Sequence, residues 1–173
     1  MRTGSVDVLL RTGTADDARR IHRLIARHAR EGRLLPRALD DIAACAPQFT
    51  VATSRARLIA CAELKPLSPS VAEVRSLVVS GRYRGLGLGR RLVNELRRRA
   101  RVQGFDQLCA FAHAPDYFER LGFTAGQHAM VPEKIEADCR QCVEFGRCGQ
   151  HAMLMELVPL TDARPLTIAQ RAV

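Results

Sequence analysis

Residues 71–100 read VAEVRSLVVSGRYRGLGLGRRLVNELRRRA and carry the strongest structural signal in the chain. Residues 72–79, with apolar positions at 72, 74 and 77–79, predict a strand, and three alternate glycines lead from it into a predicted helix. The apolar residues of that helix recur on one face, at 88, 92, 93, 96 and 100. Because a strand that enters a helix through glycines leaves backbone N–H groups unpaired, the segment predicts an anion-binding site.

The glycine pattern differs from two common phosphate-binding motifs. Gly85-Leu-Gly87-Leu-Gly89 is followed by arginines, whereas a P-loop needs Gly-Lys-Ser/Thr and a dinucleotide fingerprint needs G-x-G-x-x-G. The stretch does contain Arg84-x-x-Gly87-x-Gly89 directly after a predicted strand. It resembles the acetyl-CoA signature of the GCN5-related N-acetyltransferase (GNAT) superfamily. Tyr117-Phe-Glu-Arg-Leu-Gly-Phe123 is likewise similar to that superfamily's F-Y-E-K-L-G-F segment.

This resemblance implies where acetyl-CoA binds. In the superfamily the pyrophosphate of CoA lies on the backbone amides at the helix start, and the preceding strand binds the pantetheine arm through its backbone. The expected cofactor-binding residues are therefore Leu77, Val78, Val79, Arg84, Gly85, Leu86, Gly87, Leu88, Gly89 and Arg90. From the residues alone, a charged helix with a flexible glycine entry remains the alternative.

The rest of the chain predicts a mixed α/β architecture. Alternating apolar residues indicate strands over 6–11, 49–53, 57–64, 72–79, 107–112 and 152–157. Helical spacing and capping residues indicate helices over 14–30, 38–44, 88–100 and 116–121. The resemblance implies the GNAT fold: α/β (α+β), a mixed, mostly antiparallel sheet with flanking helices and a splayed central strand pair. We expect one acetyltransferase domain over 1–158, with a cysteine-containing insertion over 132–151 and a flexible tail over 159–173.

Glu73 is the candidate general base, because an α-ammonium must lose a proton before it attacks a thioester. Its spacing to Gly87 equals that of the general-base glutamate in the histone acetyltransferase branch of the superfamily. The residues leave open an ion pair on the strand surface for Glu73, with Glu63 on the preceding strand as the reserve base. The superfamily's general-acid tyrosine has no match, because Phe118 stands at its position and Tyr117 lies one residue early. The thiolate would then leave with help from backbone amides or water.

Three basic residues, Arg37, Arg75 and Lys134, are candidates to hold the carboxylates of an acidic acceptor together, and a surface salt bridge is the alternative for each residue alone. An arginine inside a strand is costly unless it meets an anion, and guanidinium groups bind carboxylates through paired hydrogen bonds. Together with Pro132-x-Lys134-x3-Asp138-Cys139-x2-Cys142-x2-Phe145-x2-Cys148, they resemble the acetyltransferase domain of N-acetylglutamate synthases, in the short kind without an amino-acid-kinase domain. This implies direct acetyl transfer, in a ternary complex, to the α-amino group of L-glutamate or a close relative such as glutamine. That reaction is the first step of arginine biosynthesis.

Other functions remain open at this point. A GNAT enzyme for another small amine or a protein N-terminus is one, although cationic substrates would favour acidic pockets. A non-catalytic module that binds CoA or nucleic acid is another. The chain has a net charge of +9, but no aromatic residue lies among the arginines of the predicted helix to stack bases, so we do not expect nucleic acid as a partner.

The six cysteines fall into two groups. Cys45, Cys61 and Cys109 lie in apolar segments and are expected to be core thiols. Cys139-x2-Cys142-x5-Cys148-x2-His151 supplies four ligands of the types that zinc favours, so these residues are candidates for a structural zinc site. Reduced thiols or a redox-sensitive pair are the alternatives.

The sequence contains no apolar run long enough for a signal peptide or a membrane span. We therefore expect a cytoplasmic protein with reduced cysteines, an amino-acid substrate and acetyl-CoA as its partners, and no contact with a membrane. A homodimer remains open. His113, which follows the strand over 107–112, lies near the expected acetyl group, but no catalytic role is assigned to it.

Overall fold

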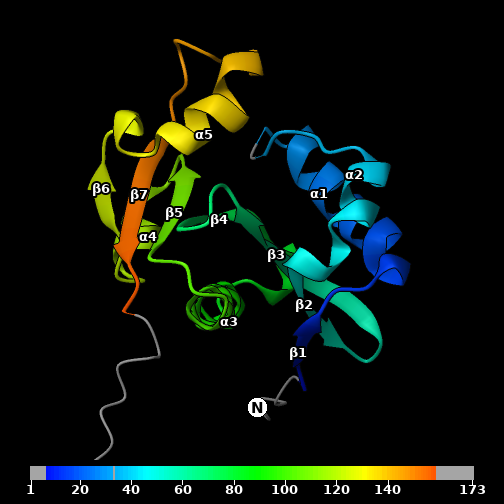
Figure 1. The fold of residues 1–173 in the computed structure, drawn as a ribbon. Helices are drawn as coiled ribbons and strands as arrows, with labels where there is room; N and C mark the ends of the chain where they lie inside the picture. The colour runs from blue at the N-terminus through cyan, green and yellow to red at the C-terminus, as the bar shows by residue number, and fades with distance from the viewer. Residues whose placement is uncertain (1–6, 33, 159–173) are drawn as a thin grey trace, which may run out of the picture.

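The computed structural model describes residues 7–32 and 34–158 and is built on one seven-stranded sheet (Figure 1). The strand order is β1-β2-β3-β4-β5-β7-β6, and every neighbouring pair is antiparallel except β4 and β5. The strands are β1 (Leu9–Thr12), β2 (Phe49–Ser54), β3 (Arg57–Pro66), β4 (Val71–Val79), β5 (Gln107–Ala112), β6 (Thr124–Gly126) and β7 (His151–Glu156).

Helices flank both faces of this sheet. The α-helices are α1 (Ala18–Arg30), α2 (Leu39–Ala44), α3 (Leu88–Val102), α4 (Pro115–Glu119) and α5 (Pro132–Ala137). Short 3-10 helices are η1 (Ala15–Asp17), η2 (Ala46–Gln48), η3 (Gly81–Tyr83), η4 (His128–Met130) and η5 (Cys139–Gln141). The predicted α/β class, the mostly antiparallel sheet and the flanking helices are confirmed. The predicted tail over 159–173 lies outside the described residues, as does Val6 of the first predicted strand.

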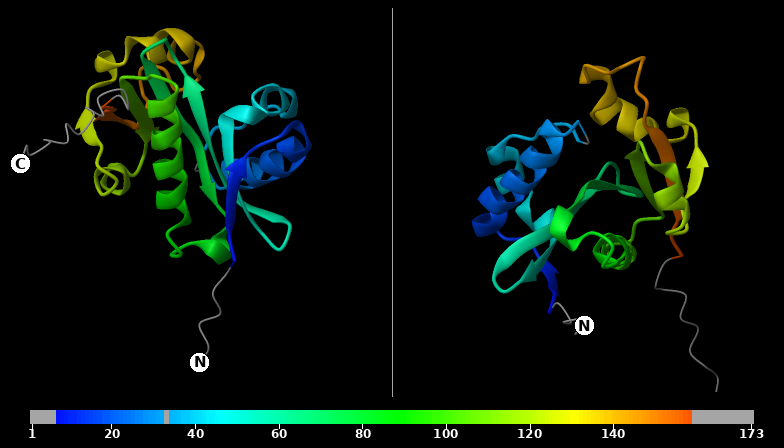
Figure 2. Two further views of the ribbon diagram at one scale, coloured as in Figure 1. Left: turned by 60° about the horizontal axis from the view of Figure 1, so that its bottom comes forward. Right: turned by 180° about the vertical axis from the view of Figure 1, so that it is seen from behind.

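The core lies on both faces of β3. Leu92 and Leu96 of α3 are fully buried with Leu64 of β3, as the apolar spacing of α3 predicts. Ile21 of α1 is buried with Cys61 on the opposite face of the same strand, since residues three apart on a strand point to opposite sides. Figures 1 and 2 show α3 on one face of the sheet and α1 and α2 on the other.

β4 and β5 separate after a short parallel contact. Their pairing runs only from Val71 with Gln107 to Glu73 with Cys109, although both strands continue. In β4, Ser76 has a φ of 51°, and the β3–β4 register shifts between Cys61 and Glu63. Such a bulge bends a strand. The bend carries the end of β4 away from β5, so the predicted splayed strand pair is present and opens the sheet at its centre.

Candidate active site

The glycine segment forms a turn that ends directly at the first residue of α3. Gly85 has a φ of 77° and Gly87, the N-cap of α3, has a φ of 72°. Both values lie in the left-handed region, which side chains with a Cβ rarely adopt. A Cβ added at either glycine would meet nothing within 4 Å, so the backbone here faces open space. The turn therefore presents the first amides of α3 to any anion that enters.

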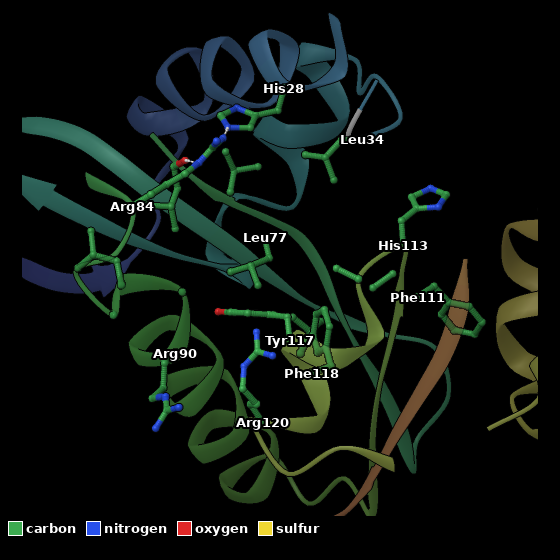
Figure 3. Close-up of a pocket in the computed structure, with 18 of the residues that line it drawn as sticks. His28, Leu34, Leu77, Arg84, Arg90, Phe111, His113, Tyr117, Phe118 and Arg120 are labelled. Carbon is green, nitrogen blue, oxygen red and sulfur yellow. Dashed lines mark hydrogen bonds between the residues drawn. The ribbon is translucent and has the colours of Figure 1, made fainter. Parts of the chain in front are cut away.

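This turn lines a cavity of about 950 Å³, which we call the loop cavity. Its walls are the end of β4, the glycine turn, the end of β5 and α4 (Figure 3). Nine of the ten predicted cofactor-binding residues line it, and Leu86 is exposed and does not. The splay of β4 and β5 thus places the predicted phosphate site and the predicted pantetheine strand on one continuous surface.

His28 of α1 reaches into the loop cavity and holds Arg84, as Figure 3 shows. Its Nδ1 lies 3.0 Å from the carbonyl of Leu24, and its Nε2 lies 2.9 Å from Nη2 of Arg84. A carbonyl only accepts and a guanidinium only donates, so the hydrogen bonds require the neutral tautomer with the proton on Nδ1. Arg84 also donates from Nε to the carbonyl of Val79 at 3.3 Å. His28 therefore orients the first residue of the glycine signature.

Two residues that the sequence left without a role also line the loop cavity. The side chain of Tyr117 lies over the first turn of α3, where a Cβ added at Gly89 would collide with its hydroxyl. Burial, which outweighs the nearby positive charges of Arg90 and Arg120, raises the pKa of Tyr117, so its hydroxyl stays protonated at neutral pH. His113 lies just past the end of β5, in the wall of the same cavity (Figure 3). Phe118 is buried in the core, as a helix position next to Tyr117 requires.

A second cavity of about 640 Å³, which we call the charged cavity, lies beside the loop cavity. It is bounded by the α1–α2 connector, β4, α5 and the cysteine-containing segment, and Arg75, Lys134 and Asp138 line it. The two cavities share Phe111 and Gln150. The two cavities therefore adjoin at these two residues.

Four charged residues form a network at the wall of the charged cavity. Lys134 Nζ donates to both carboxylate oxygens of Glu73, at 2.8 and 2.9 Å, and to Oδ2 of Asp138 at 2.8 Å. The same Oδ2 accepts from Nη2 of Arg75 at 2.9 Å. Burial alone would lower the pKa of Lys134, but the charge of Glu73 and these hydrogen bonds raise it, so the ammonium stays charged. The anion that the strand arginine Arg75 was expected to need is Asp138.

Glu73 is held away from both cavities. Its exposed fraction is 3%, both its oxygens bind Lys134, and it is absent from the walls of the two cavities. The ion pair that the sequence left open for Glu73 is thus present, although it is buried rather than on the surface. The base role for Glu73 stays a prediction.

Arg37 does not join Arg75 and Lys134. Its Nη1 donates to Oε2 of Glu63 at 2.6 Å and to Oγ of Ser76 at 3.2 Å. Glu63 is fully buried, and its other oxygen has no hydrogen-bond partner among residues 7–32 and 34–158. Arg37 lies outside both cavity walls. Through its hydrogen bond to Ser76 it joins the α1–α2 connector to the bulge of β4.

The expected zinc site is not supported. Across the part of the chain that the structure describes, no group of three or more His, Cys, Asp or Glu residues is arranged to hold a metal ion. Cys139, Cys142 and Cys148 are free thiols in the wall of the charged cavity, and His151 is exposed at the start of β7. The four residues are close in sequence but do not come together as a ligand set, and His151 is the first residue of β7. Of the three expected core thiols, Cys61 and Cys109 are buried and Cys45 is half-buried.

Sequence reasoning missed the parts that Asp138 and His28 take in the site. Asp138 entered the sequence analysis only as part of the motif over 132–148. Its spacing of four residues from Lys134 was the signal that could have predicted their contact, because residues four apart on a helix are neighbours. His28 lies 56 residues from Arg84, so no local pattern could connect them.

The family model described as the Acetyltransferase (GNAT) family matches residues 15–123, which span the glycine turn and both strands of the splayed pair. The chain therefore belongs to the GNAT acetyltransferase family and is an N-acetyltransferase that uses acetyl-CoA. An uncharacterized N-acetyltransferase of Chlorobaculum tepidum is 28% identical over 88% of this chain and 99% of its own length. An amino-acid acetyltransferase of Pseudomonas putida is 30% identical over 72% of this chain, but this match spans only 29% of the relative.

Solved structures agree with this fold. N-acetylglutamate synthase from Neisseria gonorrhoeae, complexed with coenzyme A and N-acetyl-glutamate, is 26% identical with a TM-score of 0.79. The match covers 88% of this chain and 35% of the synthase. Rv2747 from Mycobacterium tuberculosis, complexed with CoA, is 22% identical over 87% of this chain and 99% of its own, with a TM-score of 0.74, and shows the fold alone. Among the described residues, no helix has the length and apolar character to cross a membrane.

Proposed function

We propose that this enzyme acetylates the α-amino group of an acidic or amide amino acid, L-glutamate or its close relative glutamine. With L-glutamate as the acceptor, this reaction is the first step of arginine biosynthesis. The observation that carries the proposal is the contact between the two cavities at Phe111 and Gln150. Acetyl-CoA in the loop cavity and an amino acid in the charged cavity would meet there, as direct transfer in a ternary complex requires. The resemblance to N-acetylglutamate synthase supports the same substrate class.

Arg75 is the residue best placed to hold the carboxylate of the acceptor. Only its Nη2 has a side-chain partner among the described residues, so Nη1 and Nε keep donors for an incoming anion. Lys134, by contrast, uses all three of its ammonium protons on Glu73 and Asp138. An amine without a carboxylate gains nothing from Arg75, which favours amino acids over polyamines.

The amine must lose a proton before it attacks the thioester, and two residues are proposed to accept it. Glu73 reaches the acceptor only if Lys134 moves from its two oxygens. His113 lies in the cavity wall already, and a neutral imidazole has a ring nitrogen that can accept a proton. Tyr117, with its hydroxyl protonated in the loop cavity, is the proposed donor to the departing thiolate of CoA.

The proposal is tested by thiol release from acetyl-CoA with a panel of amino acids and polyamines. We expect activity with glutamate or glutamine, and we expect Arg75→Ala to raise the KM for that amino acid at least ~10-fold while changing kcat less. Arg140→Ala is the matched control, because Arg140 is an exposed arginine that pairs only with Glu136 among the residues described. Activity confined to amines without a carboxylate would refute the proposal, and an unchanged KM in Arg75→Ala would place the carboxylate elsewhere.

A further inference from the structure

The wall of the charged cavity is electrically balanced before any substrate binds. Arg75 and Lys134 carry two positive charges, and Glu73 and Asp138 carry two negative charges, all within one hydrogen-bonded network. Partial burial alone would raise the pKa of Asp138, but the hydrogen bond from Lys134 and the charges of Lys134 and Arg75 lower it. Asp138 is therefore ionised at neutral pH, and one oxygen of its carboxylate accepts from both Arg75 and Lys134.

The side chains of Glu73 and Asp138 differ in how readily they can move out of the network. Glu73 lies in the middle of β4 with an exposed fraction of 3%. Asp138 follows the last turn of α5, has non-helical backbone angles of −133° and −41°, and leads into η5. Its side chain is 29% exposed. A rotation of the Asp138 side chain would therefore carry its carboxylate into water, whereas Glu73 has no such route.

We propose that Asp138 is an internal substitute for the substrate carboxylate, which the acceptor displaces from Arg75 and Lys134 when it binds. This inference deepens the proposed function and rests on it for the identity of the acceptor. In the empty enzyme Asp138 satisfies Arg75 and Lys134 and keeps the site assembled. When the amino acid binds, its carboxylate takes Nη2 of Arg75 and the Lys134 proton that Asp138 releases, beside the free donors of Arg75 at Nη1 and Nε, and Asp138 turns to solvent.

Displacement has a consequence for specificity. The binding-competent state is only a fraction of the empty enzyme, and the apparent affinity of the acceptor is reduced by that fraction. Only a ligand with its own carboxylate can replace the hydrogen bonds that Arg75 and Lys134 lose when Asp138 moves away. An amine that lacks this group would leave Arg75 and Lys134 paired to Asp138 and would gain no binding energy from them. Asp138 is thus a specificity-determining residue for acids.

Two variants of Asp138, Asp138→Asn and Asp138→Ala, test this role. We expect each to lower the KM for glutamate or glutamine three- to ten-fold, with kcat changed less than two-fold and no gain for polyamines. Glu144→Gln is the matched control, because Glu144 also lines the charged cavity but pairs only at 3.6 Å with exposed Arg147 in the described chain. Removal of its charge tests whether any lost negative charge at the cavity has the same effect. The affinity for CoA and the melting temperature report whether each variant folds.

A direct binding measurement separates this inference from the proposed function. Glutarate, which has two carboxylates and no amine, is titrated calorimetrically into each protein saturated with CoA. We expect glutarate to bind Asp138→Ala three- to ten-fold more tightly than the parent and Glu144→Gln like the parent. Tighter glutarate binding without acetylation of any amino acid would uphold the displacement and overturn the proposed function. A raised amino-acid KM, or unchanged glutarate affinity in both Asp138 variants, would overturn the displacement.

Discussion

Nε2 of His28 accepts a hydrogen bond of 2.9 Å from Nη2 of Arg84, and this contact joins α1 to the glycine turn that precedes α3. Both residues line the loop cavity but come from different elements, and His28 is itself 5% exposed. The imidazole is fixed on its other side by the carbonyl of Leu24, so Arg84 is held by a rigid element rather than by a surface side chain. The orientation of the phosphate site therefore depends on a helix that the glycine signature does not include.

Replacement of His28 is expected to weaken CoA binding. His28→Leu fills the space but cannot accept from Arg84, so the guanidinium loses its fixed direction, and we expect the Kd for CoA to rise ~3- to 10-fold. His28→Gln retains an acceptor and should recover part of the loss. Calorimetric titration of CoA measures both. His22→Leu, at a partly exposed position of the same helix, controls for helix composition. Equal Kd values for all four proteins would show that the contact has no part in binding.

The elements that define the fold were predictable because each has a strong local pattern. The 15-residue α3 shows its apolar face in the spacing of leucines, and β5 was predicted at the bounds observed. α5, with six residues, and β6, with three, were missed. The bulge at Ser76 was also missed, because a serine at φ 51° carries no sequence signal.

The sequence predicted the part of the site that is formed by the glycine backbone. It did not predict which acidic side chains pair with the basic residues. Gly85 and Gly87 adopt the left-handed angles that glycine permits, and this requirement is local. The partners of Arg37, Arg75 and Lys134 are set by strands and helices that meet only in the fold. A basic residue in a sequence indicates an anion without saying whether that anion is a substrate or another side chain. Here Glu63, Glu73 and Asp138 supply it.

Gly89 is expected to be required because of Tyr117 rather than because of its backbone angles. A Cβ at position 89 would overlap the Tyr117 hydroxyl and lie 3.3 Å from the ring carbon that carries it. We expect Gly89→Ala to push the ring into the loop cavity and raise the Kd for CoA ~10-fold. Tyr117→Phe removes the overlapping oxygen, so the double variant should recover part of that loss. The four Kd values form a double-mutant cycle, and strict additivity would contradict a direct collision.

The proton acceptor is distinguished by which substitution lowers kcat. If His113 accepts the proton, His113→Gln lowers kcat ~100-fold. Glu73→Gln would then act chiefly through Lys134, raising the amino-acid KM with a smaller effect on kcat, because Glu73 lines neither cavity. His22→Gln serves as a control away from the cavity. A ~100-fold fall in kcat for Glu73→Gln, with His113→Gln like the parent, would assign the base to Glu73.

The pair Arg37–Glu63 is expected to be the costliest ion pair to break. Glu63 is fully buried, so Arg37→Met leaves a buried carboxylate without its 2.6 Å partner, and we expect a loss of about 3–5 kcal/mol in unfolding free energy. Arg98→Met removes the exposed partner of Glu95 and should lower the unfolding free energy far less, because solvent screens an exposed ion pair. Urea unfolding measures both. In Arg37→Met/Glu63→Leu the carboxylate is absent as well, so stability should return towards the parent, and a further loss would contradict the argument.

Asp17 is expected to make the unfolding free energy fall as the pH is lowered. The hydrogen bond from Arg11 outweighs burial and, with the backbone N–H of Thr14, lowers the pKa of Asp17 to about 2. Since the carboxylate is favoured in the folded state, its contribution is present above the ordinary pKa of an aspartate and is lost as pH falls towards 2. The shift corresponds to about 2 kcal/mol at pH 7, and about half should remain near pH 3. Asp17→Asn should therefore differ from the parent most at neutral pH. Asp16→Asn, at the exposed neighbouring position, should follow the parent throughout, and a constant difference between parent and Asp17→Asn from pH 7 to 3 would show that charge is not the cause.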